Sequence, residues 1–185
     1  MISYPAPLQN TATNDFVATI ENHSEIRMRK ALARPTYVDD LKVFSVRSAP
    51  MSGATPLHCW FNCLRAQNAG LGEVVYGWAL WYEKTRSGDV FFSQHHAVLR
   101  TPDGLVDITP YQDANKNPVV IPAITFLVDS RVPFDTERGA FPASLVWHSK
   151  SGERFWGTRD AIAWTQLDGY ATCKFEEENW ERYLP

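Results

Sequence analysis

The chain has 185 residues, a formal charge of −3 at pH 7, and a composition that is 44% hydrophobic and 21% charged. These values are typical of a globular protein, and they exclude a disordered tail protein and a coiled coil. The length predicts a single domain over 1–185. The small negative charge gives no electrostatic reason to expect a nucleic-acid partner. No stretch approaches the roughly 18 apolar residues that span a bilayer, so no membrane insertion is expected.

Three cysteines are too few, and odd in number, for a disulfide framework. Free thiols suit a reducing compartment, where they serve packing, metal binding or catalysis. The first ten residues, MISYPAPLQN, have neither the basic start nor the apolar run of a signal peptide. The sequence therefore predicts a cytoplasmic protein, and nothing in it indicates an oligomeric state.

Two helices are predicted in the first half of the chain. The first covers Thr13–Ala33, with Asn14 as its cap and Pro35 as its stop. After a loop rich in proline and glycine, the second covers Leu57–Asn68 and ends at Gly70. This second helix carries Cys59 in its first turn.

The middle of the chain has the aromatic and β-branched texture of strands. Strands are predicted over Glu73–Glu83, Val90–Arg100, Leu105–Thr109 and Val119–Asp129, with a tight turn at Thr101–Gly104 and with Pro122 favouring an edge or a bend. In the tail we expect a helix from Thr158 to Gln166 and an acidic helix from Phe175 to Tyr183. Helices followed by runs of strands predict an α+β fold, with its catalytic-like core at about 50–130.

Cys59 is the first candidate for chemistry. A thiol in the first turn of a helix faces the positive end of the helix dipole and free backbone N–H groups, which favour the nucleophilic thiolate. The same N–H groups are suited to hold an oxyanion. The alternative is that Cys59 is a small buried side chain of the core, as many free cysteines are.

The segment HHAVLRTPDGLVDITP supplies a base and its orienting acceptor. If Thr101 pairs with Gly104 across the turn, Val98 lies opposite Asp107, and His96 becomes a diagonal neighbour of Asp107 on the same face. A slip of one residue would put His95 in that place. The residues alone therefore predict a His–Asp pair without choosing between the two histidines.

Several short motifs resemble the papain and transglutaminase-like cysteine enzymes. CWFNC at 59–63 is similar to the C-x-x-N-V helix start of amino-terminal glutamine amidases, and HAVLRTPDGLVDITP is similar to the catalytic hairpin of transglutaminase-like domains. Together with GWALW at 77–81, these pieces also resemble a group of uncharacterised bacterial proteins. The resemblance implies a Cys-bearing helix packed on an antiparallel sheet, and it selects His96, because Ala97-Val98 follows it. No glutamine precedes Cys59 at the spacing of the papain oxyanion hole.

The predicted site therefore consists of catalytic Cys59, His96 and Asp107, supported by Asn62, Trp60 and Trp78. Asn62 is equally expected to be an ordinary helix position, and at least one tryptophan is expected in the core rather than in a substrate groove. Cys63, one helical turn after Cys59, is assigned to core packing.

This set predicts a cysteine-dependent hydrolase or acyltransferase that acts on an amide-type bond of a protein, peptide or small amide, with no cofactor. Peptide cleavage, deamidation and transfer to an amine share the same first half-reaction, so the residues do not choose among them. Two alternatives remain: a zinc site made of Cys59, Cys63 and His95 or His96, and a non-catalytic binding module on the same fold.

Overall fold

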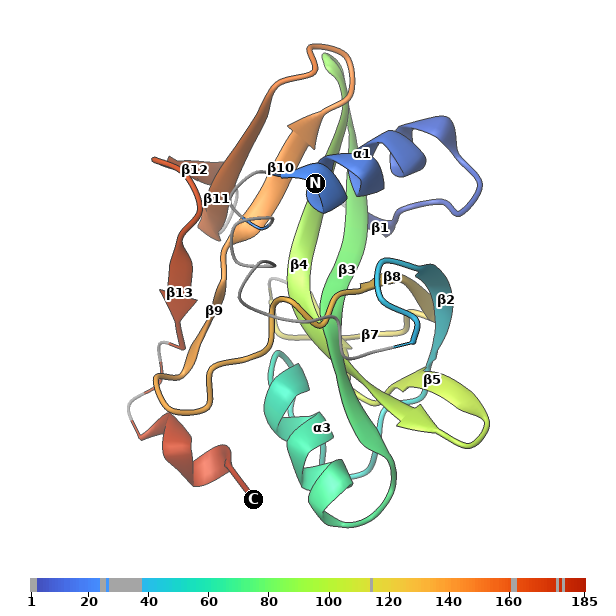
Figure 1. The fold of residues 1–185 in the computed structure, drawn as a ribbon, viewed down its shortest axis with the longest axis vertical. Helices are drawn as coiled ribbons and strands as arrows, with labels where there is room; N and C mark the ends of the chain where they lie inside the picture. The colour runs from blue at the N-terminus through green and yellow to red at the C-terminus, as the bar shows by residue number, and fades with distance from the viewer. Residues whose placement is uncertain are drawn as a thin grey trace.

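The computed structural model of the protein describes residues 3–23, 26, 38–113, 115–160, 163–175, 177 and 179–185. A long hairpin forms its centre (Figure 1). β3 (Glu73–Thr85) and β4 (Gly88–Thr101) pair antiparallel along their whole length. Both strands are largely buried, which explains why their sequences are apolar almost throughout rather than alternating.

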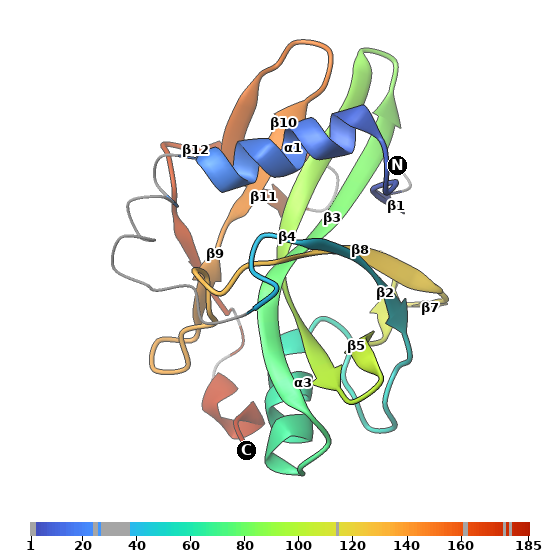
Figure 2. The ribbon, with the colours of Figure 1, turned by 45° about the vertical axis from the view of Figure 1, so that its right-hand side comes forward.

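Half of this hairpin belongs to a closed ring of five strands. β4 pairs with β5 (Gly104–Asp107), β5 with β2 (Val43–Ser48), β2 with β8 (Ala123–Val128), and β8 with β3. All these pairings are antiparallel except β2–β5. In Figure 2 the strands β8, β2 and β5 curve back toward the hairpin, where the ring closes. Closing a sheet in this way covers its strand edges and packs side chains inside it.

The other half of the hairpin extends into an open sheet. β10 (Ser144–His148) pairs with the first part of β4, β11 (Arg154–Asp160) with β10, and β12 (Ala163–Leu167) with β11. β1 (Tyr4–Pro5) pairs with β3. The helix predicted from Thr158 is therefore wrong. Pairing with β10, which buries Trp156, outweighs the local helix start signal at this position.

Two small sheets complete the strands. β6 (Tyr111–Gln112) pairs with β7 (Pro118–Val119), and β9 (Ala140–Pro142) pairs with β13 (Thr172–Lys174). The strand predicted over 119–129 is divided, because Pro122 falls between β7 and β8. Pro122 marks a bend and not a sheet edge, since β8 lies between β3 and β2.

The helices differ from their predicted bounds. α1 (Thr11–Asn22) starts two residues early, because Asn10 rather than Asn14 caps it by accepting a hydrogen bond from the backbone N–H of Ala12 at 2.8 Å. α1 ends at Asn22, and most of the remainder of its predicted range lies outside the described residues. α3 (Cys59–Asn68) begins two residues later than predicted, ends at the predicted residue, and is followed by Gly70 at a φ of +74°.

The predicted C-terminal helix is much shorter in the structure. Its described part contains a 3-10 turn, η1 (Trp180–Tyr183), while Glu176 and Glu178 lie outside the described residues. Within the described residues the fold is α+β, with two α-helices and a large, mostly antiparallel sheet. None of the helices described is long and apolar enough to cross a membrane.

Candidate active site

The ring and the open sheet leave a gap along one edge of β4. On that edge β10 pairs with residues Val90–Ser93 and β5 with residues Leu99–Thr101, so among the described strands the segment from Gln94 to Val98 pairs only with β3. His96 lies in this segment, and α3 packs against β4. A side chain from the helix can reach His96 here without displacing a strand.

The register of the β4–β5 hairpin is the one that the sequence predicts. Thr101 pairs with Gly104 and Leu99 with Val106, so the same diagonal joins His96 and Asp107. The Nε2 atom of His96 lies 3.2 Å from Oδ1 of Asp107. This is ion-pair distance, although the N–H is not aligned closely enough to form a hydrogen bond.

His96 connects Asp107 to Cys59. Burial alone would lower the pKa of His96, but the charges of Cys59 and Asp107 outweigh burial and raise it to about 10. Because Nε2 faces Asp107, Nδ1 is the ring nitrogen left to exchange a proton with the Cys59 thiol. All three side chains are buried, with exposed fractions of 4% for Cys59, 5% for His96 and 0% for Asp107.

Asp107 is held by more donors than the sequence analysis found. Its Oδ1 accepts the backbone N–H of Thr109 at 3.0 Å, and its Oδ2 accepts the hydroxyl of Tyr111 at 2.5 Å. The bond to Thr109 was visible in the sequence, because an aspartate commonly accepts the N–H two residues further on. The hydroxyl of Tyr111 comes from β6 and had no such local signal.

Asn62 joins the loop before Cys59 to the loop after Asp107. Its side chain accepts the N–H of Thr55 at 3.0 Å and donates to the carbonyl of Thr55 at 2.8 Å and to the hydroxyl of Thr109 at 3.3 Å. The loop before Cys59 is also tied to the end of β5, since the N–H of Ala49 donates to the carbonyl of Asp107 at 2.8 Å. Asn62 therefore fixes the position of the loop before Cys59 relative to the carboxylate of Asp107.

Cys63 is fully buried beside Cys59 in the cluster between α3 and the sheet. Burial, followed by the nearby Cys59 and Asp107, raises the pKa of Cys63 well above its ordinary value. Its thiol stays protonated, which agrees with the core role predicted for it.

Trp60 and His95 lie on the opposite face of β4 from His96. The indole N–H of Trp60 donates to Nδ1 of His95 at 3.0 Å, so Nε2 of His95 carries the proton and donates to the carbonyl of Val132 at 2.6 Å. Trp60 also packs on Phe134 and Phe141 at ring distances of 4.9 and 4.5 Å. Trp60 is thus core, and the groove role considered for it is not what the structure shows.

Trp78 is also core. It is fully buried under α1, and its indole N–H donates to Oδ2 of Asp129 at 3.0 Å, next to the buried ion pair of Asp129 with Arg131. The side chains of β3 alternate between two faces here, because Trp78 and Leu80 belong to one core cluster while Ala79 and Trp81 belong to another.

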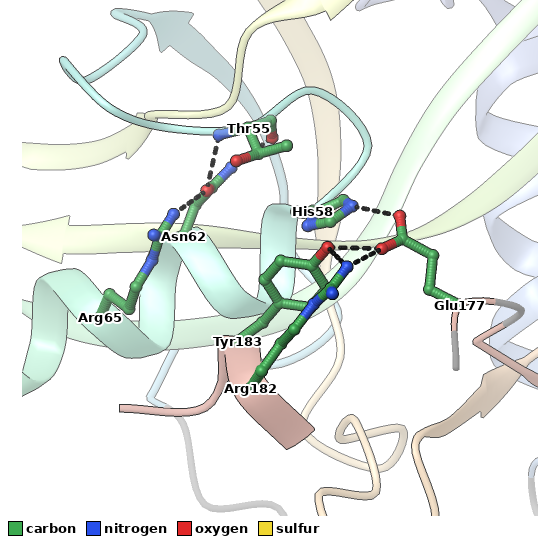
Figure 3. A network of polar contacts seen from close by, with 7 residues as sticks. All are labelled: Thr55, His58, Asn62, Arg65, Glu177, Arg182 and Tyr183. Atoms are coloured by element: carbon green, nitrogen blue, oxygen red, sulfur yellow. Dashed lines mark hydrogen bonds and ion pairs between the residues drawn. The ribbon is translucent and has the colours of Figure 1, made fainter. Parts of the chain in front are cut away.

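The C-terminal segment, meaning the described residues from Phe175 to Pro185, covers the start of α3 (Figure 3). His58 is only 5% exposed, and its Nε2 lies 3.2 Å from Oε1 of Glu177. Its ring packs edge-on against Phe175 and Tyr183 at 5.1 and 4.6 Å. The side chain of Glu177 is 44% exposed, and the residue lies in a bend rather than in a helix.

The described residues offer little support for zinc. No group of three or more His, Cys, Asp or Glu side chains among them is arranged to hold a metal ion. Both ring nitrogens of His95 are already engaged with Trp60 and Val132. Two cavities, of about 500 and 330 Å³, lie elsewhere and are not lined by Cys59, His96 or Asp107.

Comparison of the chain with family models, with curated proteins and with solved structures finds no match. Any assignment of chemistry therefore rests on the arrangement of Cys59, His96 and Asp107.

Proposed function

We propose that the protein is a cysteine-dependent hydrolase or acyltransferase that acts on an amide-type bond. The observation that carries the proposal is His96, whose pKa is raised by a thiol on one side and a carboxylate on the other. Thiol, imidazole and carboxylate in this order are the parts of a nucleophile, its base and the group that orients the base.

The first half-reaction forms a thioester. His96 takes the proton of Cys59, and the sulfur attacks the carbonyl carbon of the substrate. The carbon–nitrogen bond then breaks as His96 returns the proton to the leaving amine. The first hydrogen bond inside α3 runs from the N–H of Asn62 to the carbonyl of His58, so the N–H of Cys59 has no acceptor within the helix and is suited to the oxyanion.

The second half-reaction frees the enzyme. His96 takes a proton from water, the oxygen attacks the thioester carbon, and the sulfur leaves and regains its proton. The products are a carboxylic acid and the restored thiol. An amine in place of water gives transfer of the acyl group instead. No step uses a cofactor.

We also propose that the fold is papain-like or transglutaminase-like. The supporting features are a helix that begins at Cys59, a strand that carries His96 and the next strand that carries Asp107. The remaining predictions stay with this proposal: a protein, peptide or small amide as substrate, no nucleic-acid partner and a cytoplasmic location.

A second candidate is a binding module on the same fold. It is favoured by the burial of the three side chains, because a substrate reaches Cys59 only if the surrounding chain moves. A module needs no reactive thiol, whereas an enzyme does.

An electrophile that targets activated thiols separates the two candidates. We expect iodoacetamide to label Cys59 near neutral pH much faster than an ordinary thiol, and mass spectrometry locates the adduct. Cys59→Ala should abolish the fast labelling, while Cys63→Ala, the matched control from the same helix, should keep it. Slow labelling of Cys59 in the folded wild type would favour the binding module.

A further inference from the structure

We infer that Tyr111 is a positioning residue of this site, whose hydroxyl holds the carboxylate of Asp107 in place for His96. The inference rests on the proposed function, since it assigns a residue to the same reaction. The predicted triad does not include Tyr111, which lies four residues after Asp107 in β6.

The hydroxyl contact fixes which oxygen of Asp107 faces which partner. Oδ2 receives the hydroxyl of Tyr111 at 2.5 Å, so Oδ1 is the oxygen left to face the Nε2 atom of His96 at 3.2 Å. The N–H of Thr109 donates to Oδ1 at 3.0 Å and supports the same orientation. Without the hydroxyl, Oδ2 would be a buried acceptor with no partner among these groups, and the carboxylate would lose one of its two fixed ends.

The ring of Tyr111 also covers one side of the imidazole. It stacks against His96 with ring centres 6.3 Å apart and an interplanar angle of 25°. The ring of Tyr111 also contacts the ring of Trp81 in β3, which lies edge-on to it with ring centres 5.8 Å apart. The two aromatic rings thereby shield the His96–Asp107 pair from water, and the lower local dielectric constant strengthens the electrostatic interaction between His96 and Asp107.

A tight hairpin holds Tyr111 in position. Tyr111 pairs with Val119, and the loop between β6 and β7 is closed by Asp113, whose carboxylate accepts the N–H groups of Asn115 and Asn117 at 2.9 and 2.8 Å. Burial, and then the neighbouring Asp107, raise the pKa of Tyr111 well above its ordinary value. The hydroxyl therefore stays a donor over the whole pH range in which the thiol works.

The titratable groups that act on this cluster come from four elements. They are Cys59 and Cys63 on α3, His95 and His96 on β4, Asp107 on β5, and Tyr111 on β6. A change at Tyr111 should be felt at Cys59 through Asp107 and His96, and this makes the pH dependence of the thiol the appropriate readout.

The test is the rate at which iodoacetamide labels Cys59, measured against pH in the wild type and in Tyr111→Phe. The variant keeps the ring and loses only the hydroxyl. We expect the pH at which the labelling rate increases to be about one unit higher in the variant than in the wild type. A shift of this size corresponds to the loss of one hydrogen bond to a charged group. Tyr82→Phe is the matched control, because Tyr82 packs its ring on Tyr4 and Phe91 in a core cluster separate from the one against which Tyr111 packs.

The same comparison in an Asp107→Asn background tests the route. If Tyr111 acts through the carboxylate, Tyr111→Phe should add no further shift there. Thermal melting of each variant verifies that it is folded.

Three results would overturn the inference. If wild-type Cys59 is labelled fast and Tyr111→Phe leaves the pH dependence of its labelling rate unchanged, the proposed function stands but Tyr111 is not a positioning residue. A downward shift would mean that the hydroxyl withdraws charge from the carboxylate rather than holding it. A wild-type Cys59 that reacts as an ordinary thiol would defeat the proposed function and this role with it.

Discussion

His95 and His96 are adjacent in the chain, and β4 turns their side chains to opposite faces, where their pKa values move in opposite directions. Burial, with a smaller effect of the charge on His96, lowers the pKa of His95 to about 3. Burial acts on His96 as well, but Cys59 and Asp107 raise its pKa to about 10. One histidine is a neutral bridge in the core, and the other lies beside Cys59 and Asp107, which favour its protonated form. The pair gives the protein two distinct responses to pH.

The first prediction concerns the alkaline side. The pKa of His96 is raised from 6.5 to about 10, so the folded state holds this proton more tightly than the unfolded state. The stabilising contribution is fully present below pH 6.5 and is lost as pH rises to about 10. We expect the difference in the free energy of unfolding between wild type and His96→Gln to shrink across this window, as measured by urea titration.

Cys59→Ala provides the control for that experiment. Removing the thiol removes the leading influence that raises the pKa of His96. In a Cys59→Ala background the same loss of stability should begin at lower pH. A difference that grows with rising pH would mean that His96 is neutral in the folded protein.

The second prediction concerns the acid side and has the opposite sign. His95 is neutral in the folded protein, and its pKa lies at about 3 against 6.5 for an ordinary histidine. The unfolded chain therefore binds more protons between these values, and the protein loses stability as pH falls from 6.5 toward 3. His95→Gln should destabilise the protein by about 1–3 kcal/mol at neutral pH, because Trp60 and Val132 lose their shared partner.

The difference in the free energy of unfolding between wild type and His95→Gln should become smaller as the pH is lowered. Circular dichroism of urea unfolding at several pH values measures it. A constant difference between the two proteins would show that His95 does not titrate on unfolding.

The site was more predictable from the sequence than the fold around it. The turn at Thr101–Gly104 fixes a register, and a register fixes which side chains share a face, so His96 and Asp107 follow from local arithmetic. Trp60 and Asn62 were harder, since their roles depend on partners far along the chain, such as Val132 behind His95 and Thr109 beside Asn62.

The C-terminal part of the chain also shows that local sequence signals do not reveal distant partners. The helix predicted from Thr158 rested on local signals, but a strand at that position gains a partner in β10 that the local sequence does not reveal. Closure of the five-stranded ring likewise depends on contacts between β3 and β8, which lie far apart in the chain. Pairings of this kind are not encoded in any short stretch.

Asn62→Ala is the third prediction. Asn62 has no exposed surface, and its side chain bonds both backbone groups of Thr55 as well as Thr109. Truncation should destabilise the protein by about 2–3 kcal/mol, because buried polar groups lose their partners. It should also slow the labelling of Cys59, since the Asn62 side chain no longer links Thr55, in the loop before the thiol, to Thr109, in the loop after Asp107.

Asn68→Ala is the matched control, as it lies on the same helix with its side chain exposed. We expect it to change stability by less than about 0.5 kcal/mol. Equal effects of the two variants, measured by thermal melting and by labelling rate, would show that Asn62 is an ordinary helix position.

The last prediction concerns Gly139, on which the C-terminal segment rests. Its carbonyl accepts the N–H of Phe175 at 2.8 Å, and a Cβ added at Gly139 would lie 2.5 Å from the ring of Trp180. Gly152 has a similar positive φ, +72° against +60°, but open space where its Cβ would be. Alanine at either position bears a similar backbone cost of about 1 kcal/mol, so the clash with Trp180 is what differs between them. Gly139→Ala should therefore lower the melting temperature more than Gly152→Ala, and it should speed proteolysis within the C-terminal segment. Indistinguishable proteolysis of the two variants would mean that Trp180 does not pack on Gly139 in solution. This contact would then not hold the C-terminal segment over His58 at the start of α3.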